Sequence, residues 1–419
     1  MPYPSPQRDL ALDTVRQLRT AGFESLLAGG CVRDELLGIA PKDYDVATNA
    51  TPDQIRGLFG RRRTLPIGAA FGVVTLLGPH GAGQIDVATF RSDATYSDGR
   101  HPDSVTFTTA ERDAQRRDFT INGLFCDPLS GQIVDYVGGR DDLDRHIIRA
   151  IGDPRLRFGE DKLRLLRAVR FAAAFDFMIE PATLQAIQEM APGINEVSSE
   201  RIGMEIRRML TGPHRAVALR LLRESKLLPY VFPEVSALPD NAFDETTRIL
   251  DALDGPSLPL ALAAVLNTEH GARSTEKEFP LPAHSVGRRL RYTNKEIERT
   301  TWLLDHLPGV QDAHHLPWPQ LQRVLIHDGA QELIALATAI SDEDSPALLL
   351  CRERLAWPVD RLNPPPLVDG AALIERGHRP GPQFSELLDR IRDAQLNGEI
   401  HTRDAALALA DQLFPREPS

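Results

Sequence analysis

The spacing of apolar residues changes near residue 150. Before that point, short segments rich in valine, isoleucine and threonine end at glycines, which predicts strands. Beyond it, apolar residues recur every three or four positions, which predicts helices. We therefore expect an α+β protein, with a mixed β-sheet and helices first and an all-α region after them. The expected strands are 25–28, 44–47, 72–77, 84–90 and 105–108, and the expected helices include 8–20, 161–175, 181–190, 199–210 and 214–225.

Proline-rich connections divide the helical region. The strongest candidate linker is Pro364-Pro365-Pro366, because three successive prolines continue neither a helix nor a sheet. The expected domains are a mixed head at 1–150, a helical neck at 151–225, a helical body at 226–363 and a helical tail at 364–419.

Composition places the chain among ordinary globular proteins. It has 419 residues, 42% hydrophobic and 26% charged, which is too long for one compact core. No apolar run approaches the roughly 20 residues of a bilayer span, so we expect no membrane contact. The three cysteines, Cys31, Cys126 and Cys351, lie far apart. This spacing excludes a disulfide framework and a zinc cluster and fits a reducing cytoplasm.

The net charge of −11 at first argues against a nucleic-acid partner. The acidity is uneven, however. Residues 1–150 carry −3, residues 151–225 carry +2, and the remainder carries −10. A local basic surface in the first half could still bind a polyanion.

Two short motifs in the head suggest phosphate and metal chemistry. Gly29-Gly30-Cys31-Val32-Arg33-Asp34 joins a strand to a helix, where backbone amides and Arg33 could hold a phosphate. An ordinary glycine turn is an equal alternative. Asp43 and Asp45 lie two apart in a strand and would share a face, where Mg²⁺ would offset their repulsion. The alternative is a pair of solvated acids. Asp86, within an apolar strand, is either a third carboxylate or the partner of an arginine.

Two arginine-rich motifs follow. Arg116-Arg117-Asp118-Phe119-Thr120-Ile121-Asn122 could clamp phosphates or simply begin a helix. In the second, Asp161 and Arg164 are helical neighbours, and Arg164, Arg167 and Arg170 repeat every three residues. A carboxylate that accepts beside a guanidinium that donates can meet the edge of a nucleobase. An intrahelical salt-bridge face is the competing interpretation.

Together and in this order, the motifs resemble those of class II tRNA nucleotidyltransferases, whose head is shared with bacterial poly(A) polymerases. The similarity also includes Glu200-Arg201 with Glu205, and a loop at 96–103. It is strong over residues 20–235 and resumes at 369–405.

The resemblance implies a nucleotidyltransferase head followed by a neck, body and tail. It implies that catalytic Asp43 and Asp45 bind Mg²⁺ and that Asp86 supplies a further catalytic acid. The partners it implies are tRNA, CTP and ATP, with no protein partner. The implied nucleotide-binding residues are Gly30, Arg33, Arg117, Asp161, Arg164, Arg167 and Arg170, of which Asp161 and Arg164 would select the base.

The expected activity is template-independent CCA addition to tRNA. A CC-adding or A-adding enzyme, or a poly(A) polymerase, is the second possibility, and a catalytically inactive RNA-binding relative is the third. The intact Asp43–Asp45 pair argues against the third. Many relatives carry a His-Asp phosphohydrolase motif in the body, but the corresponding segment 258–270 has none, so we expect a degenerate body without that activity.

Overall fold

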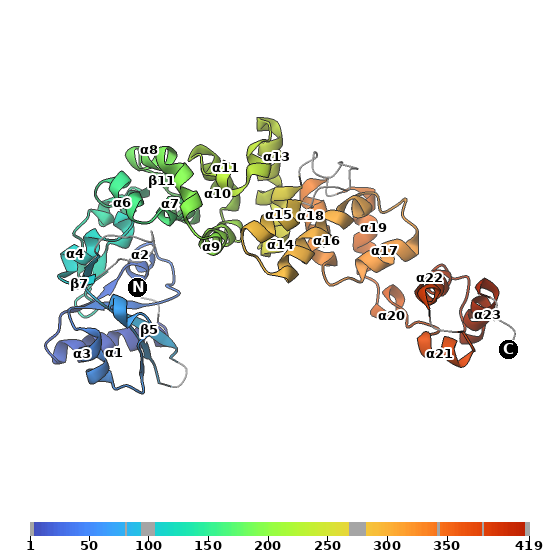
Figure 1. Ribbon diagram of the computed structural model, residues 1–419, viewed down its shortest axis with the longest axis horizontal. Helices are drawn as coiled ribbons and strands as arrows, with labels where there is room; N and C mark the ends of the chain where they lie inside the picture. The colour runs from blue at the N-terminus through green and yellow to red at the C-terminus, as the bar shows by residue number, and fades with distance from the viewer. Residues whose placement is uncertain are drawn as a thin grey trace. The chain divides into compact units, whose positions relative to one another are not determined.

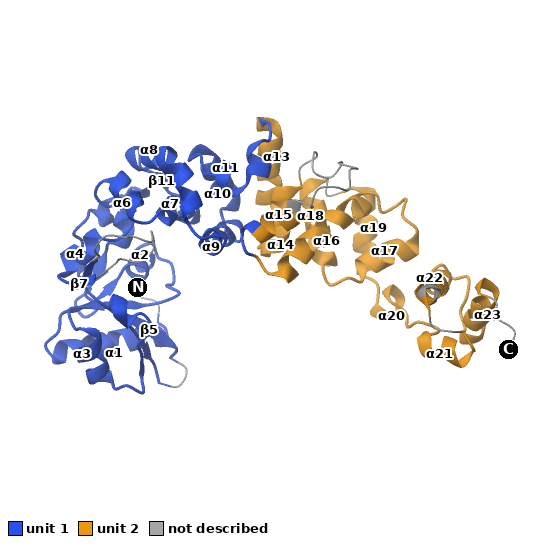
Figure 2. Ribbon diagram, in the orientation of Figure 1, with its two compact units in different colours: residues 1–239, 289–291 blue, residues 240–288, 292–419 orange. Residues whose placement is uncertain are grey.

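The computed structural model describes residues 4–79, 82–93, 105–267, 282–341, 344–378 and 381–414 (Figure 1). The chain forms two compact units (Figure 2). The first holds residues 1–239 with 289–291, and the second holds residues 240–288 with 292–419. This division is coarser than the four expected domains, whose boundaries stay predictions.

A seven-stranded mixed sheet organises the head, with the order β3-β4-β5-β2-β1-β8-β9. The pair β2 and β5 is parallel, whereas the other neighbours are antiparallel. Alternating burial along β5 places Ile85, Val87 and Thr89 inside and leaves Asp86 on the open face. The sheet strands are β1 (Ser25–Ala28), β2 (Asp45–Thr48), β3 (Thr64–Leu65), β4 (Val73–Leu77), β5 (Gln84–Thr89), β8 (Phe125–Cys126) and β9 (Ile133–Val134).

Helices pack against this sheet and against one of its short outlying strands. α1 packs against β1, β2 and β5 through Leu10, Val15 and Leu18, which are buried (Figure 1). The expected helix 8–20 therefore forms, two residues longer at its start. The remaining head elements are α2 (Gly30–Leu36), α3 (Pro52–Phe59), α4 (Ala110–Gln115), α5 (Gly139–Asp144), the 3-10 helices η1 (Ala69–Phe71) and η2 (Thr120–Asn122), and the paired strands β6 (Arg91–Asp93) and β7 (Val105–Phe107); α1 spans Pro6–Thr20.

The neck is helical except for one strand, which corrects the all-α expectation. β11 (Met178–Ile179) pairs in parallel with β10 (Ile147–Ile148), across the expected boundary at residue 150. Two residues are too few to show a strand period in a sequence. The other neck elements are α6 (Pro154–Glu160), α7 (Leu163–Phe175), α8 (Pro181–Met190), η3 (Ala191–Glu196), α9 (Ser199–Leu210), α10 (Arg215–Glu224), α11 (Leu228–Val231) and α12 (Pro233–Ser236).

The described part of the second unit is helical. α14 is its most apolar helix and is buried along nearly its whole length, and a separate cluster around Leu373 and Ile391 forms the core at the C-terminal end. No helix in the described ranges combines the length and apolar character that crossing a membrane requires. The helices are α13 (Asp240–Ala252), α14 (Leu258–Leu266), α15 (Pro282–Arg289), α16 (Asn294–Gln311), α17 (Trp318–Leu325), α18 (Ala330–Ile340), α19 (Pro346–Leu355), α20 (Val359–Leu362), α21 (Gly370–Glu375), α22 (Pro382–Leu396) and α23 (Arg403–Leu413).

Candidate active site

Two carboxylates face each other across neighbouring strands of the head sheet. The register of the parallel strands β2 and β5 pairs Asp45 with Asp86, and both residues are exposed. The hydroxyl of Thr75 on β4 donates to Asp86 Oδ1 at 2.7 Å. Asp43 precedes β2 and is also exposed. Tertiary pairing therefore places Asp86 beside Asp45, where the sequence left a carboxylate cluster and an arginine partner both open.

The crowding of negative charge is visible in the protonation of Asp45. Partial loss of solvent and the charge of Asp86 raise the pKa of Asp45 to about 6, with a further contribution from Asp43, although Arg117 acts in the opposite direction. A carboxylate held in this way gains from a bound cation. An oxygen-only set of donors on adjoining strands fits the preference of Mg²⁺.

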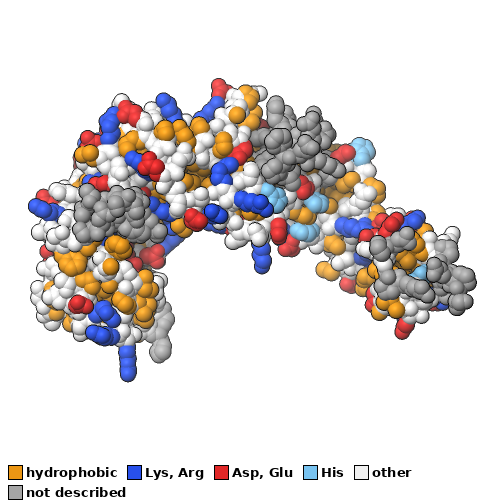
Figure 3. Space-filling view, in the orientation of Figure 1, with side chains coloured by type: hydrophobic (Ala, Val, Ile, Leu, Met, Phe, Trp, Pro, Cys, Tyr) orange, Lys and Arg blue, Asp and Glu red, His pale blue; other side chains and the backbone are white. Residues whose placement is uncertain are grey.

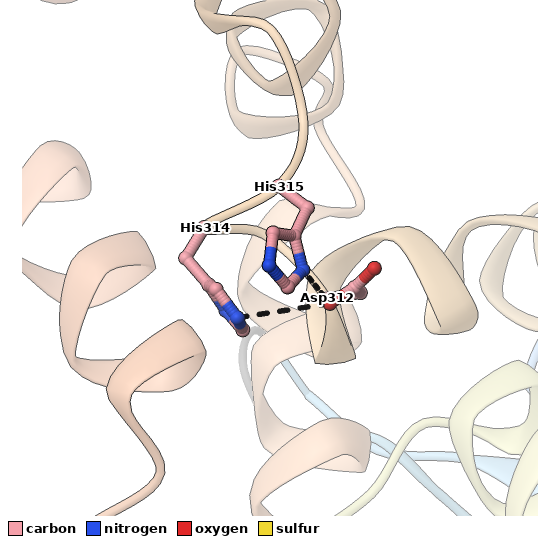
Figure 4. A group of neighbouring side chains, drawn as sticks. All are labelled: Asp312, His314 and His315. Atoms are coloured by element: carbon pink, nitrogen blue, oxygen red, sulfur yellow. Dashed lines mark hydrogen bonds and ion pairs between the residues drawn. The ribbon is translucent and has the colours of Figure 1, made fainter.

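A different group of potential metal ligands follows α16 (Figure 4). Among the residues that the structure describes, only Asp312, His314 and His315 form a trio whose donor atoms all lie within 4.8 Å of one another. The donor atoms of Asp43, Asp45 and Asp86 do not all lie within that distance of one another. All members of the trio are exposed, and His315 Nδ1 lies 2.7 Å from Asp312 Oδ1. Both histidines pair with the Asp312 carboxylate, so geometry alone assigns this trio no role.

A tight turn after β1 lets an arginine approach the backbone. Gly29 has a φ of 69°, in the left-handed region that favours glycine. A Cβ at this position would lie 2.6 Å from Arg117 Nη1. Arg117 is held by Asp113 at 3.1 Å, and its guanidinium lies 5.0 Å from the ring centroid of Phe125. Gly29 therefore makes room for Arg117 just before the start of α2.

Arg33 reaches the same region from α2. Its Nη1 donates to Asn122 Oδ1 at 2.5 Å, and its Nη2 donates to Asp34 Oδ1 at 2.6 Å. Its guanidinium also lies 4.6 Å from the ring centroid of Phe175 and 5.1 Å from that of Phe171. These contacts orient Arg33, which is buried, beside Arg117.

These side chains line a cavity of about 540 Å³ within the first unit. Six arginines against two aspartates give its wall an excess of positive charge, which suits a polyanion. All seven residues predicted to bind the nucleotide lie on this wall, whereas Asp43, Asp45 and Asp86 do not. Their roles stay predictions. The lining residues are Gly29, Gly30, Arg33, Arg116, Arg117, Asp118, Asn122, Asp161, Arg164, Arg167, Arg170 and Phe171.

The predicted arginine stripe on α7 faces the cavity, and a different carboxylate holds each of its members. Arg164 Nη1 donates to Glu160 Oε2 at 2.5 Å. Arg167 donates from Nε and Nη2 to Asp118 Oδ2 at 2.8 and 2.6 Å. Arg170 Nε donates to Glu205 Oε2 at 2.5 Å. Glu160 ends α6, Asp118 lies between α4 and η2, and Glu205 belongs to α9, so the stripe is no simple intrahelical salt-bridge face.

Asp161 departs from the helical position that the sequence suggested. α7 begins at Leu163, and Asp161 has extended backbone geometry with φ −148° and ψ 107°. Its Oδ1 accepts from the Leu163 amide at 3.0 Å, and its Oδ2 accepts from Arg201 Nη2 at 2.7 Å. The carboxylate therefore accepts from the first amide of α7 and pairs with Arg201 of α9 rather than with Arg164.

Sequence reasoning assigned no role to several residues that hold the cavity together. Asp118 also accepts from Asn122 Nδ2 at 2.9 Å. Burial by itself would raise the pKa of Asp118, but Arg167 and Asn122 outweigh that effect and hold it far below its usual value. From α9, Glu205 accepts from Arg170, and Arg201 donates to Asp161. All four lie inside the sequence motifs, but a motif does not name the partner of a charge.

Comparison with known proteins supplies the family. Residues 25–149 match the family model for the poly A polymerase head domain, and residues 176–238 match that for the probable RNA and SrmB-binding site of polymerase A. A CCA-adding enzyme of Limosilactobacillus reuteri is 31% identical over 403 residues, which cover 93% of each chain. One of Geobacillus stearothermophilus is 33% identical over 404 residues, again 93% of each. The chain belongs to the family of CCA-adding enzymes.

Solved structures agree with this family. The crystal structure of the Bacillus stearothermophilus CCA-adding enzyme in complex with CTP is 30% identical, with a TM-score of 0.78 and 98% of each chain covered. The Thermotoga maritima CCA-adding enzyme complexed with tRNA shares the fold, with 20% identity, a TM-score of 0.68 and coverage of 97% and 95%. The predicted fold class, nucleotidyltransferase activity and CCA addition are thereby confirmed.

Two family features expected from the sequence fall partly or wholly outside the described residues. The loop at 96–103 lies wholly outside them. Of the segment 258–270, which corresponds to the His-Asp motif, residues 268–270 lie outside. A His-Asp doublet, His327-Asp328, lies later in the body and is among the described residues. The His327 ring stacks on Trp302 with centroids 3.8 Å apart, and Asp328 pairs with Arg299 at 2.6 Å. These contacts give the doublet a packing role in this CCA-adding enzyme.

Replacing Asp118 with Asn should lower the free energy of unfolding by about 3 kcal/mol, because it leaves the Arg167 charge without its buried partner. Urea unfolding at pH 7 measures this. The matched control is Asp144→Asn, which breaks an exposed pair with Arg140 and should cost less than about 1 kcal/mol. Equal losses in the two variants would contradict the structural role of Asp118.

Replacing Asp45 with Asn should raise the melting temperature in EDTA, and more at pH 8 than at pH 5. The native pKa of about 6 lies above the ordinary value of 3.8 for an aspartate, so the folded wild type binds more protons across that window and loses stability as pH rises through it. Asparagine does not ionise, so the variant does not lose this stability as the pH rises. Asp53→Asn, at an exposed position in the first turn of α3, is the control. A gain independent of pH would contradict the assigned pKa.

Proposed function

We propose that this CCA-adding enzyme transfers CMP and AMP from CTP and ATP to the 3′ end of tRNA, selecting the nucleotide with its own side chains. The observation that carries the proposal is the arginine-rich cavity, which holds Asp161 and Arg164 on its wall. The acidic pair of β2 and β5 belongs to the same unit, and Arg117 acts electrostatically on Asp45. Transfer from a nucleoside triphosphate needs positive charge to hold the phosphates and carboxylates to hold the metal. The relatives supply the substrate identities, since their structures hold CTP and tRNA.

Asp43 and Asp45 would hold Mg²⁺, with Asp86 as a further acidic neighbour. The donor chemistry and the raised pKa of Asp45 support this assignment. When bound, the metal would promote attack by the terminal hydroxyl and stabilise charge on the phosphates. Neighbouring Thr75 holds the Asp86 carboxylate in place through its hydroxyl.

Arg33, Arg117 and the backbone at Gly30 would bind the triphosphate. In the reaction the 3′-hydroxyl oxygen bonds to the α-phosphorus, the α–β bridging bond breaks, and pyrophosphate leaves with the released electron pair. Both guanidinium groups are already fixed by Asp34 and Asp113, so they need no reorganisation as charge moves onto the leaving group. Positioning and electrostatics are the contributions of these residues.

Asp161 and Arg164 would select the base. The Asp161 carboxylate accepts hydrogen bonds and the Arg164 guanidinium donates them, so together they can meet an exocyclic amine and a neighbouring acceptor on cytosine or adenine. Arg201 anchors Asp161 from one side, and Glu160 anchors Arg164 from the other. Arg167 and Arg170 would complete the wall around the nucleotide.

A cytoplasmic location is part of the proposal. The three cysteines are free and buried in the structure, as suits a reducing compartment.

Product length tests the proposed activity. With tRNA that lacks its 3′ end, we expect two added residues from CTP alone and three from CTP with ATP, resolved on a sequencing gel. Two residues even with ATP would indicate a CC-adding enzyme, and long tails from ATP a poly(A) polymerase.

Asp43→Ala should reduce incorporation at least about a hundredfold. Asp53→Ala, at an exposed acid in α3, should match wild type, and equal activity of both variants would exclude Asp43 as a metal ligand.

Replacing Asp161 with Asn should weaken discrimination between nucleotides more than it lowers turnover. Asparagine keeps an oxygen to cap Leu163 but presents an amide donor where the carboxylate accepts. Misincorporation of UTP and GTP relative to CTP, measured as ratios of kcat/KM, should rise roughly tenfold or more. Glu189→Gln, at an exposed acid on α8 that pairs with Arg155, is the control. Unchanged ratios in Asp161→Asn would remove Asp161 from base selection.

A further inference from the structure

Tyr44 lies between the aspartates Asp43 and Asp45 and is buried, with 1% of its surface exposed. The connection that leads to it from α2, residues 38–43, is exposed or half-buried throughout. Exposure alternates over these three residues, so the tyrosine ring points into the head while both aspartates are exposed. Tyr44 therefore attaches the acidic segment to the interior of the head.

The strand ladders begin only after Tyr44. The register of β2 with β5 starts at Asp45, and the register of β2 with β1 starts at Val46. Asp43 and Tyr44 precede both ladders, so backbone pairing in the sheet fixes neither of them. The position of Asp43 consequently depends on how its neighbour Tyr44 is held.

Two helices hold the Tyr44 side chain. Its hydroxyl donates to Glu35 Oε1 of α2 at 3.0 Å, and Arg8 Nε of α1 donates to the same oxygen at 3.2 Å. We name these three residues the tyrosine anchor. Burial and the Glu35 carboxylate raise the pKa of Tyr44, so the hydroxyl keeps its proton and stays a donor. A hydrogen bond to a charged acceptor is stronger than one between neutral groups.

The tyrosine anchor is shielded from water more than most charges of the molecule. Figure 3 shows acidic and basic side chains interspersed over the face in view, and exposed pairs of this kind contribute little. The side chains of Arg8 and Glu35 are only 17% and 19% exposed. Partial burial weakens the screening of their interaction, so the anchor can hold a position that a surface pair could not.

α2 connects the anchor to the nucleotide cavity. Glu35 follows Arg33 by two positions, which is about 200° around a helix, so the two side chains leave α2 on opposite sides. Arg33 lines the nucleotide cavity, whereas Glu35 and Arg8 line a separate cavity of about 380 Å³. One helix thus carries the proposed triphosphate ligands on one side and holds the acidic segment on the other.

We propose that Tyr44 is a positioning residue that acts through Glu35 and Arg8, fixing Asp43 and Asp45 relative to α2 and thereby raising their affinity for a divalent cation. The proposal rests on the proposed function, because it takes the acidic pair as the metal site. Ligands that are already in place lose less freedom when the ion binds. Residues that orient metal ligands without touching the metal act in this way.

Tyr44→Phe tests the anchor, because it keeps the ring and removes only the hydroxyl. Binding of Mn²⁺ in place of Mg²⁺ is measured by electron paramagnetic resonance without nucleotide or tRNA, so the readout does not depend on turnover. We expect the Kd for Mn²⁺ to rise about tenfold. Binding of CTP in EDTA should stay within about twofold of wild type, because Asp34 and Asn122 hold Arg33 independently of Tyr44.

Variants of Glu35 show whether Tyr44 acts through this carboxylate. Glu35→Gln keeps an oxygen that can accept from Tyr44 and should hold the Kd for Mn²⁺ within about threefold of wild type. Glu35→Ala keeps no acceptor and should weaken Mn²⁺ binding as Tyr44→Phe does. The double variant should then bind no more weakly than either single variant, since both remove the same interaction. Additive losses would contradict action through Glu35.

Tyr136→Phe is the matched control. This tyrosine is 42% exposed and follows β9, which β1 and β8 separate from β2 in the sheet. The control should bind Mn²⁺ as wild type does. Wild-type affinity for Mn²⁺ in Tyr44→Phe, with the affinity lost in Asp43→Ala, would overturn the inference alone. An equal loss of CTP binding in EDTA would also overturn it, because Tyr44 would then support the fold in general.

Failure of the proposed function gives a different result. If wild-type protein binds Mn²⁺ no more tightly than Asp43→Ala, the acidic pair is not the metal site, and the inference falls with that assignment.

Discussion

The pairing of buried or half-buried arginines with carboxylates is the interaction on which this catalytic unit depends. Six guanidinium groups on one cavity wall would repel one another and point away. Asp113, Asp118, Glu160 and Glu205 prevent this, because each accepts hydrogen bonds from an arginine that lines the cavity. The wall thus presents positive charge to the cavity, while the four carboxylates behind it offset the repulsion among the guanidinium groups. Such an arrangement fixes an anion site in place before the ligand binds.

The same contacts join elements that are far apart in the sequence. Asp118 follows the arginine pair of the head and binds Arg167 of α7, so one ion pair links the Arg116-Arg117 motif to the neck helix that lines the cavity. Phe171 takes part as well, since the guanidinium groups of Arg33 and Arg170 lie 5.1 and 3.9 Å from its ring centroid. Head and neck residues therefore form one wall, in keeping with their membership of one compact unit.

The acidic part of the site follows the opposite rule. Asp45 and Asp86 lie in register on parallel strands, and the pKa of Asp45 rises to about 6. The carboxylates behind the cavity wall are paired with arginines. Asp45 instead carries a negative charge close to that of Asp86, and a bound cation would stabilise it. Charges that are paired inside the fold are held in place, whereas the negative charge left in excess on β2 is available to bind a cation.

Local pattern in the sequence was enough for the longer strands and helices and for a family resemblance that the comparisons confirmed, because apolar period and turn residues act over a few positions. Tertiary structure alone decided which charges meet. It set Asp86 beside Asp45, gave Asp161 to Arg201 rather than to a helical neighbour, and added β11 to the neck. Such pairings join residues tens of positions apart, and no local periodicity records them.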